Sequence, residues 1–149
     1  MKTIFDEDTR EELIQRISSL NEQSMRQWGK MSMYQVLKHC TVWDEWIQGK
    51  GTYKYTQSFL GLIFGKLALK STVNNDRPMK KNMPAGDLKV KETTGDVEAQ
   101  KKKWIASISD YQNFSNPGFV HDFFGRMSKE EIGIFVYKHA DHHLRQFSS

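Results

Sequence analysis

The C-terminal segment of the chain constrains the fold most, because it combines a complete helix signature with most of the histidines. Ser128 and Glu131 form a capping box, in which each side chain accepts a hydrogen bond from the backbone N–H of the other residue. Apolar residues and histidines then recur at the spacing of one helix face, namely Ile132, Phe135, Val136, His139, His143, Gln146 and Phe147. The pattern predicts a helix whose buried face carries two imidazole rings.

The spacing of His139 and His143 leaves two interpretations open. Residues four apart stack on one face of a helix, about one turn from each other. Both rings can therefore reach a single transition-metal ion if a third ligand comes from elsewhere. Alternatively, each is a core histidine with its own buried hydrogen-bond partner. His142 lies one position off the buried stripe, but a spacing of three also shares a face, so it is an alternative ligand to His143.

A third imidazole comes from a second predicted helix, which follows the N-cap candidate Ser32 and ends at Gly49. His39 lies at the edge of the apolar stripe of this helix. Taken alone it would be a core or rim histidine, but with the C-terminal pair it completes a set of three. Trp43 and Trp46 follow on the same helix and either line a pocket or pack in the core.

Two glutamines stand close to these histidines in the sequence. Gln35 precedes His39 by one helical turn, and Gln146 follows His143 by three positions. An amide in such a position can orient a ligating imidazole or contact a substrate. The alternative for each is an ordinary hydrogen bond at the surface or between helices. No residue stands out from the sequence as a catalytic acid, base or nucleophile.

The rest of the chain also favours helices, because it has only three prolines and few alternating, strand-like runs. The predicted elements are a helix from Asp8 or Thr9 to Trp28 ended by Gly29, a short buried helix over Phe59–Leu69, a helix from its cap Asp96 to about Tyr111, and irregular loops over Asn74–Gly95 and Asn113–Met127. We expect one all-α domain over residues 1–149, an antiparallel four-helix bundle with an extra short helix and a long irregular loop.

Composition restricts the location and the partners of the protein. The single cysteine, Cys40, excludes an internal disulfide, and the first residues contain no apolar signal core, so we expect a cytoplasmic protein. The run Phe59–Leu69 is interrupted by Lys66 and is too short to span a bilayer. We therefore expect no membrane partner, with membrane association as the lesser alternative.

Charge also argues against nucleic acid as a partner. The net charge is +4, and the lysines cluster in two runs, Lys80–Lys81 and Lys101–Lys103, which we interpret as solvated faces. Binding of nucleic acid would need a broader basic stripe or stacking aromatic residues among the charges. His121 lies in a loop rich in aromatic residues and is expected to be structural. Cys40 is expected to pack in the core and not to act with His39 as a catalytic pair.

The order of these motifs resembles the DinB-like superfamily of metal-binding four-helix bundles, and within it a family of uncharacterised bacterial proteins. The C-terminal His-x-x-His-His motif, followed by Arg145 and Gln146, is the most specific match. Where other superfamily members have Arg-Gly-Gln, this chain has Leu144-Arg145-Gln146, which lacks the glycine and keeps the Gln. The other matching pieces are Trp28-Gly29-Lys30-Met31-Ser32 leading to Gln35 and His39, Phe59 to Lys70, Arg77-Pro78, Asn82-x-Pro84 and His121-Asp122-Phe123-Phe124-Gly125.

The resemblance implies that His39, His139 and His143 are the ligands of a divalent transition metal, which can be zinc, nickel or iron. Three imidazoles leave a coordination position open for water or for a thiol. Characterised relatives include metal-dependent transferases and isomerases that use low-molecular-weight thiols, and relatives are often dimers. The expected function is thus that of a metal-dependent enzyme acting on a small molecule, such as a thiol-dependent transferase. The alternative is a non-catalytic metal-binding or ligand-binding stress-response protein.

Overall fold

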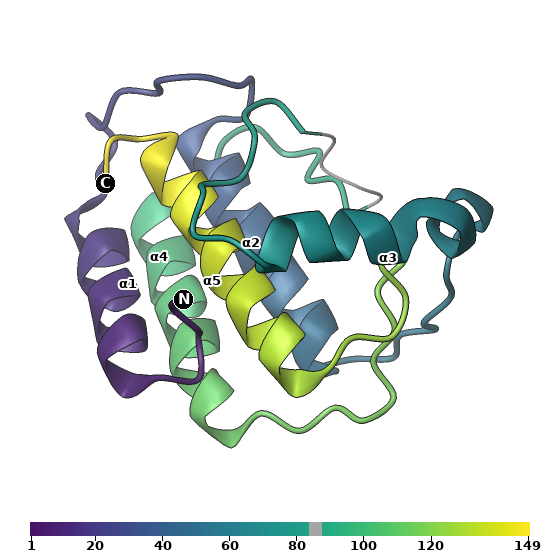
Figure 1. The fold of residues 1–149 in the computed structure, drawn as a ribbon. Coiled ribbons are helices and arrows are strands. Elements are labelled where there is room, and N and C mark those ends of the chain that lie inside the picture. The colour runs from purple at the N-terminus through teal and green to yellow at the C-terminus, as the bar shows by residue number, and fades with distance from the viewer. Residues whose placement is uncertain (84–87) are drawn as a thin grey trace.

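The computed structural model describes residues 1–83 and 88–149, and within these residues the protein is all-helical (Figure 1). The described part of the chain contains no β-strand, and its β-pairing is limited to an isolated bridge between His121 and Gly125. The elements are α1 (Glu7–Ser19), α2 (Met33–Gln48), α3 (Phe59–Val73), α4 (Val97–Asp110), the short 3-10 helix η1 (Tyr111–Asn113) and α5 (Lys129–Arg145).

Four of the helices share one hydrophobic core. Helix α4 lies against both α1 and α2, and α5 lies against α1 and α2 from the other side. Trp104 of α4 is fully buried at the centre of this arrangement. Helix α3 differs from the other four, because it contacts α5 and crosses it, with one end extending away from the other helices (Figure 1).

The caps that the sequence predicts for α2, α4 and α5 are confirmed, whereas α1 begins after Asp6 without a side-chain cap. Ser32 and Ser128 each form a complete capping box, with Gln35 and Glu131 as the partners. Asp96 accepts a hydrogen bond from the Ala99 N–H at 2.9 Å and begins α4. Gly49 ends α2 with a φ of 71°, in the left-handed region where a residue without a Cβ has little strain.

The first helix is shorter than predicted. It begins after Asp6 and ends at Ser19, so Trp28 and Gly29 lie in an irregular segment and do not end the helix. Lys101 of α4 explains the early end, because its ammonium group donates to the carbonyl oxygens of Ser18, at 3.0 Å, and of Leu20. A buried cation at this position satisfies carbonyls that have no partner within the helix and complements the negative end of the helix dipole.

The prediction that the run Lys101–Lys103 is a solvated face is wrong for Lys101. Its side chain is buried, whereas Lys102 and Lys103 are exposed as predicted. A run of like charges on a helix points in successive directions about 100° apart, so one of three neighbours can face inward while the others remain solvated. The hydrogen bonds to α1 provide the partners that a buried ammonium needs.

The prediction of a buried helix over residues 59–69 is confirmed for the helix and wrong for its burial, because most of its side chains are exposed. The helix forms and extends to Val73, but its buried residues are Gly61, Gly65, Leu69 and Val73. A Cβ at Gly65 would lie 2.1 Å from the carbonyl oxygen of Phe123, so α3 approaches the 121–125 loop through the bare backbone of its glycines. The large apolar side chains consequently point away from the core.

The predicted loop over 74–95 is irregular wherever the structure describes it, and its residues 84–87 lie outside the described part. Lys138 of α5 anchors the start of this loop, because its ammonium group donates to the carbonyl oxygens of Thr72, Asn75 and Arg77. Searched over the described residues, the chain contains no helix that has both the length and the apolar character to cross a bilayer.

A buried carboxylate joins α2 to α4. Asp44 accepts hydrogen bonds from the Trp104 indole N–H at 3.0 Å and from the Tyr111 hydroxyl at 2.9 Å. Burial raises the pKa of Asp44 to about 7, although the hydrogen bonds from Tyr111 and Trp104 act in the opposite direction. The carboxyl group therefore takes up a proton near neutral pH, where an exposed aspartate remains ionised.

Replacing this carboxyl group should remove part of the pH dependence of stability. Because the pKa of Asp44 is raised in the folded state, its protonation stabilises the fold below about pH 7, and that contribution is lost as the pH rises through this value. Asp44→Asn cannot titrate, so its destabilisation should be larger at pH 6 than at pH 8 by about 1 kcal/mol. Urea unfolding of the metal-free wild type and of Asp44→Asn at the two pH values measures this difference. The histidines are present in both proteins, so their contribution to the pH dependence cancels. An equal cost at both pH values would contradict the assignment.

Candidate metal centre

Three imidazole rings from two helices converge inside the fold. His39 comes from α2, and His139 and His143 come from successive turns of α5. The ring centroids lie 5.3 Å apart for His39 and His139, 4.8 Å for His39 and His143, and 4.7 Å for His139 and His143. One nitrogen of each ring lies within 4.8 Å of the others, so the three histidines could hold a metal ion.

The helix geometry explains this convergence. The spacing of four residues places His139 and His143 on the same face of α5, and that face packs against α2. A zinc ion with nitrogen ligands at about 2.1 Å would bring the nitrogens to within about 3.4 Å of one another. One nitrogen of each ring lies within 4.8 Å of the others, so the rings would have to move closer together to bind a single zinc ion.

Aromatic rings surround the three histidines. The Trp43 ring lies 5.2 Å from that of His139 and 6.0 Å from that of His39. Phe135 stacks against His139 from one turn earlier on α5, with ring centroids 6.0 Å apart. Apolar walls of this kind exclude water and strengthen electrostatic interactions at the nitrogens.

Burial keeps these imidazoles uncharged. It lowers the pKa of His39 to about 4, with the Leu88 backbone offsetting part of the effect, and lowers the pKa of His143 to about 3. The pKa of His139 is also lowered well below its usual value, first by burial and then by the neighbouring histidines. At neutral pH all three rings are therefore in the neutral form that binds metal ions. Part of the His139 surface still meets solvent, whereas His39 and His143 are buried.

Gln146 determines which nitrogen of His143 is free. The side-chain oxygen Oε1 of Gln146 lies 2.6 Å from Nδ1 of His143. An amide oxygen can only accept, so Nδ1 carries the hydrogen and Nε2 keeps its lone pair for a ligand. The sequence singled out Gln146 as a candidate for this kind of contact, and the structure brings it to His143.

The segment before α2 holds Gln146 in place. The backbone N–H of Gln27 donates to the Gln146 carbonyl at 2.7 Å, and Nε2 of Gln146 lies 3.5 Å from the Trp28 carbonyl oxygen. Gly29 has a φ of 82°, and a Cβ there would lie 2.6 Å from Nε2 of Gln146. The positive φ favours glycine at this position, and a Cβ there would displace the end of the Gln146 side chain.

Gln35 has other partners in the structure. Its Oε1 accepts from the Ser32 N–H at 3.0 Å, and its Nε2 donates to the Val90 carbonyl at 3.2 Å. The amide thus completes the cap of α2 and attaches the segment that follows residue 87. Sequence spacing alone could not show this, because a glutamine one turn before a ligand and a glutamine in a capping box occupy the same position.

His142 lies next to the cluster of three and outside it. Its ring centroid is 5.2 Å from that of His143 and 5.9 Å from that of Trp28. Burial lowers the pKa of its imidazole, and the backbone of Met79 partly reverses this effect. This position agrees with its offset from the buried stripe of α5, which directs the ring toward the 27–29 segment and the loop around Met79.

His121 is bonded within its own loop, and one of its ring nitrogens is unpaired. Its Nδ1 accepts from the backbone N–H groups of Phe123 and Phe124, at 3.1 and 3.2 Å, and also lies 2.8 Å from Oδ1 of Asp122. Its Nε2 is buried and has no hydrogen-bond partner among the described residues. The indole donor Nε1 of Trp43 is likewise buried without a partner there, and its ring lies 5.5 Å from that of His121. Nothing in the sequence signalled these two unpaired nitrogens, because both depend on contacts between distant segments.

The fold and the site together define the protein as an all-helical protein with three clustered histidines that could hold a metal ion. The chain matches the profile of a family described as a protein of unknown function (DUF1569) over residues 5–149, and it belongs to that family. No curated protein and no solved structure matches the chain.

Loss of the contact to His143 should weaken metal binding without unfolding the protein. Gln146→Ala removes the group that orients the imidazole, so we expect zinc to bind about 10- to 100-fold more weakly. Gln27→Ala is the matched control, since Gln27 contacts Gln146 only through its backbone N–H. Calorimetric titration with zinc measures both variants. Equal affinities for Gln146→Ala and the wild type would show that the amide does not orient a ligand.

Proton competition should be weak at this site. If three ligating histidines had an ordinary pKa near 6.5, the metal affinity of their site would fall roughly a thousandfold between pH 7.5 and pH 5.5. With the pKa of His39 at about 4 and that of His143 at about 3, the rings remain neutral over this range. We expect the zinc affinity to fall less than about tenfold, as measured by equilibrium dialysis and elemental analysis. A thousandfold fall would show that the imidazoles titrate normally.

Proposed function

We propose that the protein is a divalent-metal-dependent enzyme that acts on a small molecule through the site formed by His39, His139 and His143. One observation carries the proposal: three neutral imidazoles converge, and no fourth histidine, cysteine, aspartate or glutamate of the described chain joins them. Structural zinc sites are normally closed by four protein ligands, whereas catalytic sites have three and an open position.

The donor set fits such an ion. Imidazole nitrogen suits zinc, nickel and iron, and the Nδ1 contact with Gln146 gives His143 the outer partner that ligating histidines usually have. When bound, the ion would supply Lewis acidity, which lowers the pKa of a water or thiol at the open position.

The substrate class we favour is a low-molecular-weight thiol, with the protein acting as a thiol-dependent transferase. Cys40 does not supply the sulfur, because it is buried and burial raises the pKa of its thiol well above the usual value. Thiolate chemistry at this site would therefore need a thiol from the substrate. The resemblance to DinB-like relatives that use such thiols supports the same class.

The chain also provides partners for a polar substrate group. Nε1 of Trp43 is a buried N–H group without a partner in the described protein, and the Trp43 ring borders both His39 and His139. Nε2 of His121 is a second buried nitrogen without a partner there. A buried polar group without a partner is costly, so a polar ligand group that bonds to either nitrogen would recover that cost. In this proposal Trp43 and His121 position the substrate, while Trp43 and Phe135 exclude water.

The fold that goes with this function is an antiparallel four-helix bundle of the DinB-like type. Support comes from the contacts of α1 and α2 with both α4 and α5, which form a closed ring of four helices with the histidines between α2 and α5. In bundles, metal sites are built in the core from side chains on facing helices. Helix α3 is then the extra short helix.

Elemental analysis of protein purified without an affinity tag or chelator tests the metal site. We expect close to one equivalent of transition metal in the wild type and loss of the metal in His143→Ala. His142→Ala is the matched control, because His142 is also buried, lies beside His143 and is not one of the three ligands. Absence of metal even after reconstitution, or equal metal contents in the two variants, would contradict the site.

Cobalt substitution tests the thiol. Addition of a small thiol to the cobalt-loaded protein should produce a sulfur-to-metal charge-transfer absorption, and His143→Ala should not show it. Metal that binds tightly, stabilises the fold and remains unaffected by thiols or other small molecules would instead indicate the non-catalytic alternative.

A further inference from the structure

Helix α3 presents an apolar surface that the proposed metal site does not use. The exposed side chains are Phe59 (74%), Leu60 (60%), Leu62 (68%), Ile63 (57%), Phe64 (53%) and Leu67 (74%). With roughly 200 Å² for a fully exposed large apolar side chain, they leave on the order of 700 Å² of apolar surface in water. The largest apolar patch of a typical monomer is about 300–600 Å², so a surface of this size indicates an interaction.

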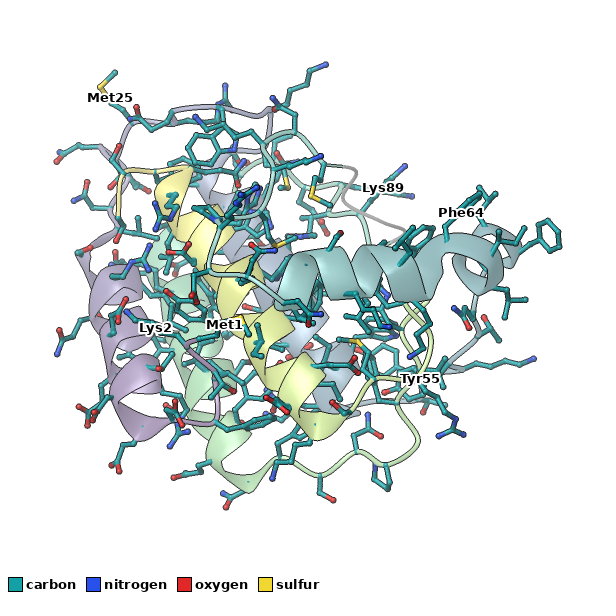
Figure 2. The ribbon with its side chains drawn as sticks, in the orientation of Figure 1. Met1, Lys2, Met25, Tyr55, Phe64 and Lys89 are labelled. Carbon is teal, nitrogen blue, oxygen red and sulfur yellow. The ribbon has the colours of Figure 1, made fainter. Side chains whose placement is uncertain are left out.

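The packing of α3 makes this exposure unavoidable. Gly61 and Gly65 lie on the side that faces the 121–125 loop, where a Cβ on either would come within 2.4 Å of the Phe123 carbonyl oxygen. Residues 59, 63, 60, 67 and 64 fall on the opposite side of the helix at about 100° per residue. Figure 2 shows Phe64 on the outer side of α3, pointing away from the other helices.

Helix α3 itself carries only positive charge. Between Glu45 and Asp76, which flank this part of the chain, there are four lysines and no aspartate or glutamate. Lys50 is paired with Asp110, and the Lys66 ammonium donates to the Arg126 carbonyl, which leaves its charge uncancelled. Lys54 and Lys70 are exposed. A partner for α3 must therefore offer an apolar layer together with negative charge.

We propose that α3 is a peripheral attachment helix that lies on an anionic lipid surface. Helices that attach in this way rest in the plane of the interface, with the apolar side chains about 5–10 Å into the acyl boundary and the lysines reaching the headgroup phosphates. Lys66 and Lys70 are exposed on the same helix as the apolar residues, so their ammonium groups can reach that layer. A second copy of the chain fits less well. Two α3 faces in a symmetric contact would place lysines against lysines, with no carboxylate on either helix to balance them.

Vesicle flotation tests this inference on the full-length protein. The variant Phe59→Gln, Phe64→Gln and Leu67→Gln changes three exposed side chains, so the fold and its thermal transition should be retained. Met25→Gln is the matched control, because Met25 is 77% exposed and lies outside α3. Each protein is mixed with vesicles of phosphatidylcholine alone or with about 30 mol% phosphatidylglycerol, a fraction that gives an anionic surface.

We expect the wild type and Met25→Gln to float with the anionic vesicles, and the triple variant to bind at least about tenfold more weakly. Lys70→Gln should weaken binding about fivefold, since one lysine near an anionic surface contributes about that factor. Equal binding to neutral and anionic vesicles would overturn the proposal. A wild type that does not float with the anionic vesicles would also overturn it. Light scattering would then show whether the wild type is a monomer or a dimer that the triple variant converts to a monomer.

Discussion

The contact between α2 and α5 is the constraint on which the rest of the structure depends. It places His39 opposite His139 and His143, so that three neutral imidazoles share one apolar enclosure. A buried polar group costs free energy unless it is paired. Gln146 pairs Nδ1 of His143, and one nitrogen of each of the three rings lies within 4.8 Å of the others, so an ion between them could satisfy all three.

Loops far apart in the sequence complete this contact. The 27–29 segment holds Gln146, the segment after residue 87 is attached through Gln35, and the 121–125 loop is organised around His121. In each loop, backbone groups form hydrogen bonds with a single residue, which is how irregular segments compensate for the absence of helical bonding. The surroundings of the histidines therefore depend on all three connections as well as on the two helices.

Two buried lysines determine where other elements end. Lys101 donates to carbonyls at the end of α1, and Lys138 donates to carbonyls at the end of α3 and in the loop that follows. In both cases a cation from a neighbouring helix meets the negative end of a helix dipole. Burial of these ammonium groups is tolerated because several carbonyl oxygens replace the lost water.

The sequence by itself determined the local structure and the candidate ligands. Caps at Ser32, Asp96 and Ser128 and the shared face of His139 and His143 all follow from short-range rules, because helix periodicity and capping act over one or two turns. Only the tertiary structure decided the end of α1, the exposure of α3 and the unpaired ring nitrogens of Trp43 and His121. Each of these depends on a partner more than 60 residues away, or on glycines whose packing face is set by another loop, and no local pattern records such a partner.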